Sequence, residues 1–227
     1  MTALELDAAT KEHPGSPPVT ALRSVTLTIA EGEFAALVGP SGSGKSTLLA
    51  IAGTLERPTS GRVRIAGTAV AHLPDRELAA VRAYRIGFVF QQFFLVPTLS
   101  ALENVASGLL YRGLSAAQRR HAAADALAKV GLAHRAEHRP SELSGGEQQR
   151  AAIARALVGS PSLILADEPT GSLDTASGRD ILTLLRSLNA AGSTILIATH
   201  NPEIAAAVPR TIRLRDGAIE SDTGPAA

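Results

Sequence analysis

The feature that most constrains the fold is the octapeptide Gly39–Ser46, which reads Gly-Pro-Ser-Gly-Ser-Gly-Lys-Ser. It fits the pattern G-x-x-x-x-G-K-[ST], whose glycines let the backbone curl until successive N–H groups point at one anion. The apolar run Phe34–Val38 predicts a buried strand before it, and Lys45–Ala52 predicts a helix that ends at Gly53. A strand, a phosphate-binding loop and a helix in this order predict an α/β fold.

Strands and helices alternate along much of the remaining chain, which favours the same fold class. Short apolar or alternating runs predict strands, and the dipeptide Asp216–Gly217 predicts a hairpin. The expected strands are Val25–Ile29, Arg62–Ile65, Ile86–Phe90, Leu163–Ala166, Thr194–Ala198, Thr211–Arg215 and Ala218–Ser221, the expected helices are Asp75–Tyr84 and Ala176–Ala191, and Lys11–Pro18 is an expected loop.

From Ala101 to Leu157 the pattern changes to helix, and capping boxes mark where helices begin. Ser115 with Gln118 has the required spacing and predicts a helix to Val130. A second box of the same kind, Ser144 with Glu147, predicts a helix to about Leu157. We therefore expect a single domain, 1–227, with a nucleotide-binding core of residues 1–90 and 158–227 and a helical lobe of residues 91–157.

The side chains that end the loop suit a nucleotide with its metal ion. Lys45 should reach the β- and γ-phosphates, and the Ser46 hydroxyl should ligate Mg²⁺. A glycine-rich loop with a chance lysine is the alternative, which the strand–loop–helix context disfavours. The residues expected to bind ATP here are Gly39, Pro40, Ser41, Gly42, Ser43, Gly44, Lys45, Ser46 and Thr47.

Two acids, Asp167 and Glu168, follow the apolar run Leu163–Ala166. Because adjacent residues at a strand end point in different directions, one acid can face the metal and the other the γ-phosphate. We expect Asp167 to hold Mg²⁺ through water and Glu168 to act as the general base that polarises the attacking water. A simple turn is the alternative, since Asp-Glu-Pro is turn-like.

Composition excludes several other classes of function. The chain has no cysteine, so it has neither a disulfide framework nor a Cys-ligated zinc site. A net charge of +1 without a basic run, and only 3% aromatic residues, argue against a nucleic-acid surface. The chain has no apolar stretch of about 20 residues and no secretory signal, so we expect a cytosolic protein that does not span a membrane by itself.

The segment Leu143–Arg150, which reads Leu-Ser-Gly-Gly-Glu-Gln-Gln-Arg, resembles the signature sequence of ATP-binding-cassette (ABC) ATPases. With the phosphate loop and the acid pair in family order, the resemblance covers nearly the whole chain. It implies a P-loop NTPase of RecA-like type, with a mostly parallel core, an antiparallel β subdomain and an α-helical subdomain. It also implies hydrolysis of ATP to ADP and phosphate with Mg²⁺.

The resemblance implies roles for three further residues. Gln91 corresponds to a glutamine that senses Mg²⁺ and the γ-phosphate; Gln92 is adjacent, and Gln91 is preferred because it follows the expected strand Ile86–Phe90. His200 corresponds to a histidine that contacts the γ-phosphate, with a plain helix-capping neighbourhood as the alternative. Asp174 corresponds to an aspartate that acts across a dimer.

Ser144 has a local role as the N-cap of its helix, and the resemblance adds a second role. With Ser144 and Gly146 exposed, the start of the helix is an anion site. In the family the anion is the γ-phosphate of ATP held by the other subunit. We therefore expect Ser144, Gly145 and Gly146 to contact nucleotide on a second copy of this chain, in a homodimer.

The position expected to contact adenine departs from the family pattern. The family usually places an aromatic residue there, upstream of the phosphate loop. Aligning Val19–Leu22 with the family puts His13 near that position. An imidazole can stack on adenine, with less area, and a solvated loop residue is an equal alternative. Asn201, where aspartate is common, is a second and milder departure.

The family mostly powers membrane transporters, so the resemblance implies a permease on a separate chain and a peripheral position at the cytoplasmic side of the membrane. The apolar loop Phe93–Pro97 is the expected contact with a cytoplasmic helix of that permease, with core packing as the alternative. Segments Ile86–Gln92, Leu95–Val105 and Ala166–Asp174 resemble the lipoprotein-release and macrolide-export branch. Members of that branch close a dimer with ATP and pull on a permease.

Three other functions stay open. The first is the ATPase subunit of an importer, which often carries an extra C-terminal regulatory domain. The second is a soluble cassette ATPase acting on DNA or ribosomes, whose members carry long coiled coils, zinc sites or two cassettes. The third is a P-loop small-molecule kinase, which has no use for Leu143–Arg150 or His200.

Overall fold

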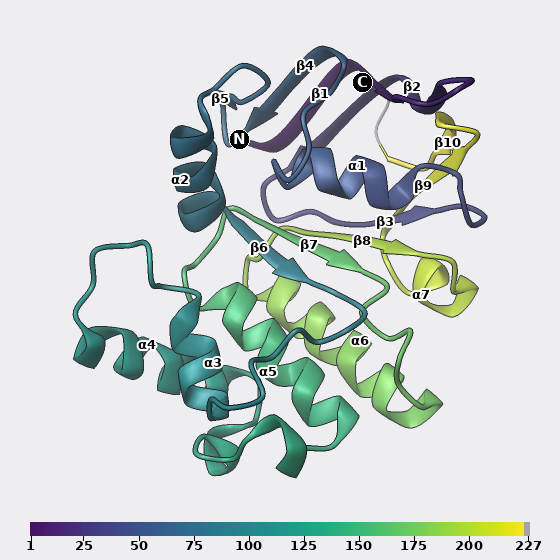
Figure 1. The fold of residues 1–227 in the computed structure, drawn as a ribbon. Coiled ribbons are helices and arrows are strands. Elements are labelled where there is room, and N and C mark those ends of the chain that lie inside the picture. Colours follow the sequence, from purple (N-terminus) through teal and green to yellow (C-terminus); the bar gives the residue numbers. More distant parts are fainter. Residues whose placement is uncertain (225–227) are drawn as a thin grey trace.

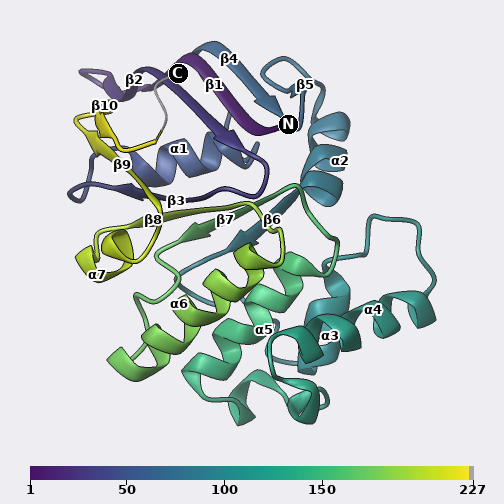
Figure 2. The ribbon, with the colours of Figure 1, turned by 180° about the vertical axis from the view of Figure 1, so that it is seen from behind.

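The computed structural model describes residues 1–224 as two β-sheets with helices between and below them (Figure 1). In Figure 1 the smaller sheet lies at the top, helix α1 lies between the two sheets, and helices α3 to α6 lie beneath the larger sheet. Figure 2 shows the same layers from behind. The smaller sheet is antiparallel, with the order β2-β1-β4-β5 and the bounds β1 Thr2–His13, β2 Val19–Ala30, β4 Ser60–Ile65 and β5 Thr68–Ala69.

The larger sheet has the strand order β10-β9-β3-β8-β7-β6. All its neighbouring strands run parallel except β9 and β10, which form an antiparallel hairpin at one edge. This arrangement confirms the fold class expected from the sequence. The strands are β3 Phe34–Val38, β6 Ile86–Val89, β7 Leu163–Asp167, β8 Ile195–Thr199, β9 Arg210–Arg215 and β10 Ala218–Asp222.

Helices connect the parallel strands, as parallel pairing requires. The phosphate loop leads from β3 into α1, and α5 and α6 lie against the lower face of the larger sheet in Figure 1. The helices are α1 Lys45–Ala52, α2 Asp75–Arg85, α3 Ala101–Ser107, α4 Ala116–Lys129, α5 Gly145–Leu157, α6 Thr175–Ala190 and α7 Pro202–Ala206, with short 3₁₀ turns at Ala133–Arg135 and Pro140–Glu142.

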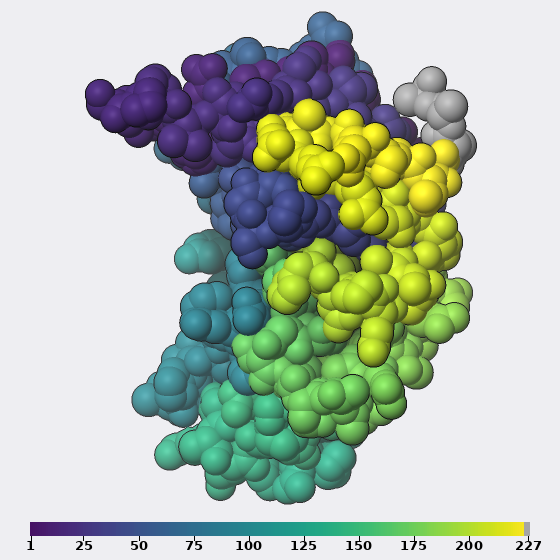
Figure 3. Space-filling model, turned by 90° about the vertical axis from the view of Figure 1, so that its right-hand side faces the viewer, coloured from purple at the N-terminus to yellow at the C-terminus, as the bar shows by residue number. Residues whose placement is uncertain are grey.

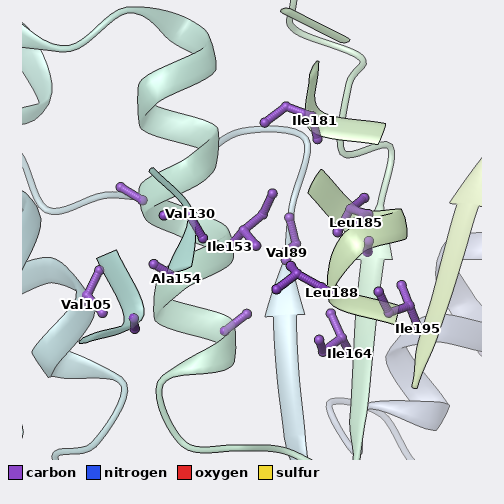
Figure 4. Packing of buried hydrophobic residues seen from close by; sticks show 14 of the residues in the cluster. Val89, Val105, Val130, Ile153, Ala154, Ile164, Ile181, Leu185, Leu188 and Ile195 are labelled. Carbon is purple, nitrogen blue, oxygen red and sulfur yellow. The ribbon is translucent and has the colours of Figure 1, made fainter. Parts of the chain in front are cut away.

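Two hydrophobic clusters hold the layers together, one on each face of the larger sheet. In β3, Ala36 and its alternate neighbours belong to the cluster with the helices below, whereas Ala35 and Leu37 belong to the cluster with α1 and the smaller sheet. This alternation follows from the two-residue period of a strand. Figure 4 shows the lower cluster, where Ile153 of α5 and Leu185 of α6 meet the sheet.

The first strand is the main difference from the sequence prediction. Residues 2–13 form β1, and Lys11–Pro18 is not a loop throughout, because β1 continues to His13 and the hairpin turn lies between β1 and β2. The register of β1 shifts between Leu6 and Ala9 and again before Lys11, and Ala8 has a φ of 50°. These bulges break the strict alternation that identifies a strand in a sequence.

Helices α4 and α5 of the helical lobe begin at capping boxes that the sequence predicted. The capping boxes at Ser115 and Ser144 are both present, and a third box at Ser100 caps α3. Helix α5 contacts α3 and α4 as well as β6 and α6, so it joins the lobe to the larger sheet. None of the helices within residues 1–224 combines the length and apolarity needed to cross a bilayer.

Gly87 of β6 provides a test of the contact between the larger sheet and α5. A methyl group there would lie 2.4 Å from the carbonyl oxygen of Ala156, which belongs to the backbone of α5. We expect Gly87→Ala to lower the free energy of unfolding by about 1–3 kcal/mol because the helix backbone has to shift. Chemical denaturation measures the change.

The matched control is Gly178→Ala in α6, where the added methyl would meet Thr170 at an ordinary contact distance of 3.6 Å. This change should stabilise the protein by up to about 1 kcal/mol, because alanine favours helix over glycine. Equal effects of both substitutions would contradict the steric argument.

Candidate active site

The phosphate loop, Gln91, the acid pair and His200 meet in one cavity of about 480 Å³ at the carboxyl-terminal edge of the larger sheet. Parallel strands bring the loops after their carboxyl ends to one edge, where α/β proteins place their ligands. The loops after β3, β6, β7 and β8 all contribute to this cavity, together with the start of β2. Its lining residues are Val19, Thr20, Ala21, Ser41, Gly42, Gly44, Lys45, Ser46, Thr47, Gln91, Asp167, Glu168 and His200.

The phosphate loop depends on glycine at two positions where other backbone comes close. A methyl group on Gly39 would lie 2.2 Å from the carbonyl oxygen of Leu214, and one on Gly44 would lie 2.4 Å from that of Ala21. Gly44 also has a φ of 102°, in the left-handed region. Gly39, Pro40 and Ser43 shape the loop without lining this cavity, whereas the other expected residues of the loop line it.

Lys45 is 9% exposed and directs its ammonium group back into the loop. Its Nζ donates to the carbonyl oxygens of Gly39 at 2.8 Å and Pro40 at 2.9 Å. An ammonium group has three donors, so one is left for a phosphate oxygen. The loop therefore fixes the lysine in position before any phosphate enters.

Ser46, Asp167 and Gln91 line the same cavity. Burial raises the pKa of Asp167, against the opposing influence of its hydrogen bond with Ser46 and the charge of Lys45. A hydroxyl, a carboxylate and an amide oxygen are the kinds of ligand that Mg²⁺ takes in nucleotide sites. The residues present therefore fit a magnesium ion.

Glu168 is held by three donors from the end of β8. Its Oε1 accepts from the backbone N–H of His200 at 3.0 Å and lies 2.6 Å from the Nδ1 atom of His200. Its Oε2 accepts from the hydroxyl of Thr199 at 3.1 Å. Glu168 has a φ of 45°, an uncommon backbone conformation that its hydrogen bond to Ala198 helps to fix.

Thr199 was not singled out by sequence reasoning, although it contacts Glu168. It is fully buried at the end of β8, and its hydroxyl also accepts from the backbone N–H of Asn201 at 3.0 Å. Its position directly before His200 is the only sequence feature that points to a role in the site. Threonine is common in strands, so this feature does not distinguish it from an ordinary strand residue.

Gln91 lines the cavity and Gln92 does not, which agrees with the preference for Gln91. The strand β6 ends at Val89, so Gln91 lies in the loop that follows and not at the strand end. Its side chain passes over Gly171, where an added methyl group would lie 2.9 Å from the Gln91 Nε2 atom.

Gln149 is a second residue that sequence reasoning did not single out within the signature segment. It is fully buried in α5, and its Nε2 donates to the carbonyl oxygens of Pro169 at 2.6 Å and Phe90 at 3.3 Å. The residue therefore ties the signature helix to the loops that carry Gln91 and Glu168.

A sequence profile of the ABC transporter family matches residues 22–171, about two thirds of the chain. The chain belongs to the ABC transporter family. It binds and hydrolyses ATP.

Similar proteins place it in the branch that the sequence indicated. The macrolide export ATP-binding/permease protein MacB of Chromobacterium violaceum is 51% identical over 222 residues, which cover 97% of this chain and 34% of that protein. The chain thus spans about a third of the length of MacB. An uncharacterised ABC transporter ATP-binding protein of Thermotoga maritima is 52% identical over 206 residues, covering 91% of this chain and 88% of that one.

The fold is similar to solved ABC structures over its whole length. The ATP-binding cassette MJ0796, in a dimeric post-hydrolysis state bound to ADP and Pi, is 45% identical with a TM-score of 0.88. The alignment covers 99% of both chains. The same TM-score is found with another dimeric structure of MJ0796.

In this ABC cassette the start of the signature helix lies outside the nucleotide cavity. Ser144 is exposed, and its capping box with Glu147 uses bonds of 2.8 Å and 3.3 Å. The expectation that Gly146 is exposed is wrong. Gly146 is buried because the first turn of α5 packs against α6, where Ser177 would contact a methyl group on Gly146 at 3.4 Å. Gly145 is half-buried.

Asp174 caps helix α6 and also lies outside the cavity. Its carboxylate accepts from the backbone N–H groups of Ala176 and Ser177 at 3.0 Å and from the Ser177 hydroxyl at 2.7 Å. Hydrogen bonds from Ser177 are the main cause of its lowered pKa. These contacts lie within one subunit. The action of Asp174 across a dimer therefore stays a prediction.

His13 ends β1 directly opposite Val19 of β2 and is half-buried. Val19 lines the nucleotide cavity, whereas His13 does not. Figure 3 shows the hairpin between these strands, in purple, projecting from the body of the cassette. Stacking of His13 on adenine therefore stays a prediction.

Proposed function

We propose that this cassette is one subunit of a homodimer that drives a permease on a separate chain, at the cytoplasmic side of a membrane. The observation that carries the proposal is the division of its motifs. The phosphate loop, the acid pair, Gln91 and His200 share one cavity, but Ser144 lies outside it. A second copy is the source of a Ser144 that can complete the site, and the dimeric MJ0796 structures support this arrangement.

Within one subunit, the loop N–H groups and Lys45 hold the phosphates of ATP. Ser46, Asp167 and Gln91 would hold Mg²⁺, which neutralises phosphate charge when it is bound. Glu168 takes a proton from water as the water oxygen forms a bond to the γ-phosphorus and the bond to the leaving ADP oxygen breaks. His200 and Thr199 orient Glu168 through the three hydrogen bonds at its carboxylate.

Across the dimer, the hydroxyl of Ser144 and the N–H of Gly145 are the groups offered to the γ-phosphate of the other copy. The N-terminus of α5 adds partial positive charge, which favours an anion there. ATP then acts as a bridge between two cassettes, and its hydrolysis removes the bridge. Closing and opening of the dimer is the step that moves the permease.

Ser144→Ala tests this bridging role, with Ser115→Ala as the matched control. Both serines cap helices through a capping box, so each change should cost about 0.5–2 kcal/mol of stability. ATP turnover should fall about tenfold or more in Ser144→Ala because a bond to the γ-phosphate is lost, and stay near wild type in Ser115→Ala. Steady-state phosphate release and thermal melting measure the two effects. Equal losses of turnover would assign Ser144 a capping role only.

The permease itself is tested by purification of the tagged chain from detergent-extracted membranes of its host. We expect an untagged integral membrane protein to copurify and to raise ATP turnover. Its absence, with ribosomes or DNA recovered instead, would favour a soluble cassette ATPase. The resemblance to MacB supports export or force transmission, and an importer is the second candidate that the identity of the permease would decide.

A further inference from the structure

The turn Asp216–Gly217 between β9 and β10 lies against the phosphate loop, although the two segments are far apart in the sequence. Strand β9 pairs in parallel with β3, and the last residues of this pairing are Val38 and Arg213. The phosphate loop starts directly after Val38, while β9 continues to Arg215, so the turn lies beside the loop. In Figure 3 the hairpin, in yellow, lies against the purple strands of the smaller sheet and the blue segment that holds the loop.

Both backbone polar groups of Gly217 form hydrogen bonds outside their own hairpin. The N–H of Gly217 donates to the carbonyl oxygen of Ser43, in the middle of the phosphate loop, at 3.0 Å. The carbonyl oxygen of Gly217 accepts from the N–H of Arg23 in β2 at 2.7 Å. Gly217 therefore joins the phosphate loop to β2 through its backbone alone.

The fit around Gly217 leaves no room for a side chain. Gly217 is buried with a φ of 80°, and a methyl group on it would lie 2.8 Å from the carbonyl oxygen of Ala21. The same oxygen would lie 2.4 Å from a methyl group on Gly44 of the loop. Turn, β2 and loop are thus packed backbone to backbone, and Ala21 lines the nucleotide cavity. A shift forced at Gly217 has to be taken up by backbone that forms this cavity.

Ser43 has little support besides this turn. It is 2% exposed, and its hydroxyl oxygen is buried without a hydrogen-bond partner. Its N–H donates to the carbonyl oxygen of Pro40 at 3.2 Å, which lies within the loop. Among residues 1–224, the bond from Gly217 is the one hydrogen bond that ties Ser43 to chain outside the loop.

The loop has to present successive N–H groups to one phosphate, so its affinity depends on how well the empty loop keeps that shape. Lys45 holds the first residues of the loop from inside, through the carbonyl oxygens of Gly39 and Pro40. Gly217 holds the middle of the loop from outside, through Ser43. The carboxylate of Glu168 is held separately, from the end of β8.

We infer that Gly217 is a positioning residue for ATP, because its turn fixes the phosphate loop in the shape that binds phosphate. Gly217 does not line the nucleotide cavity, so it acts through Ser43 and Ala21 and not by contact with the nucleotide. The inference concerns one subunit and depends on neither the permease nor the dimer.

The turn Ala66–Gly67 between β4 and β5 is a matched control within the same chain. Its two residues have φ values of 45° and 78°, and those of Asp216–Gly217 are 48° and 80°. Both are two-residue turns, closed by the pairs Ile65–Thr68 and Arg215–Ala218. Gly67 is exposed, and a methyl group on it would meet nothing within 4 Å. Gly67→Ala therefore introduces the same backbone strain without a contact.

Gly217→Ala should raise the KM for ATP about 3- to 10-fold, the loss expected for one hydrogen bond, and leave kcat within about twofold of wild type. Gly67→Ala should leave both constants unchanged, although thermal melting should show that both variants are less stable. Inorganic tripolyphosphate, measured by competition with a fluorescent ATP analogue, should lose affinity for Gly217→Ala by the same factor as ATP, because the loop binds phosphate and not the base. An unchanged KM, an equal rise in Gly67→Ala, or an unchanged affinity for tripolyphosphate would each overturn the inference.

Amide hydrogen exchange of the wild-type protein keeps the inference testable if Gly217→Ala does not fold. Coupling between two sites is reciprocal, so a nucleotide that binds better when the turn is in place must also strengthen the hold on the turn. Saturation with MgADP should slow exchange of the Gly217 amide about 3- to 10-fold more than that of the Ala66 amide, which donates to Ala3 at 2.9 Å in the control hairpin. Equal slowing of both amides, or no slowing of the Gly217 amide, would contradict the coupling.

Discussion

Glu168→Gln should lower steady-state ATP turnover by about 10²-fold or more, because an amide cannot accept the proton of the attacking water. ATP should still bind, since the groups that hold the phosphates and the metal ion are untouched. The variant should therefore accumulate as an ATP-bound dimer, which light scattering detects as a doubling of mass in the presence of MgATP.

The geometry around Glu168 makes this variant a clean test. A glutamine oxygen can still accept from the backbone N–H of His200, as Oε1 does now at 3.0 Å, so the β7 and β8 ends should keep their positions. Glu203→Gln is the matched control, because this exposed acid does not line the nucleotide cavity. Normal turnover in Glu168→Gln would refute the assignment of Glu168 as the general base.

Lys45→Ala should instead raise the dissociation constant for ATP by about 10- to 100-fold, the loss expected for charge-assisted hydrogen bonds to phosphate. Lys45 also ties the carbonyl oxygens of Gly39 and Pro40 together, so the loop loses its internal support as well as its cation. Titration with a fluorescent ATP analogue measures the affinity.

Lys129→Ala, at the end of α4 and away from the cavity, is the control for loss of a lysine. Lys45→Ala should not form the ATP-bound dimer that Glu168→Gln forms. The two variants thus separate nucleotide binding from hydrolysis. Unchanged ATP affinity in a folded Lys45→Ala protein would contradict the role given to this lysine.

The sequence predicted correctly the features that depend only on residues close together in the chain. The strand Phe34–Val38 and helix Lys45–Ala52 were predicted with their observed bounds. The boxes at Ser115 and Ser144 were identified because a serine and a residue three positions later satisfy each other's backbone. The missed strand β1 shows the limit, since its bulges are stabilised by pairing with β2 and β4.

Long-range contacts decided the rest. Thr199 touches Glu168 across 31 positions of sequence, and Gln149 reaches Phe90 across 59. The burial of Gly146 depends on the packing of α6 against α5. No local sequence pattern predicts these contacts. Threonine, glutamine and glycine would fit the same strand or helix equally well if the contacts were absent.

By itself, then, the sequence determined the phosphate loop, its flanking strand and helix, and the residue types of an ABC ATPase. The chemistry of that loop is carried by neighbours in the chain, so spacing alone specifies it. Only the tertiary structure brought Asp167, Glu168, Gln91 and His200 to the loop and left Ser144 outside. It also placed the turn Asp216–Gly217 against the carbonyl oxygen of Ser43, because folding sets which distant segments become neighbours.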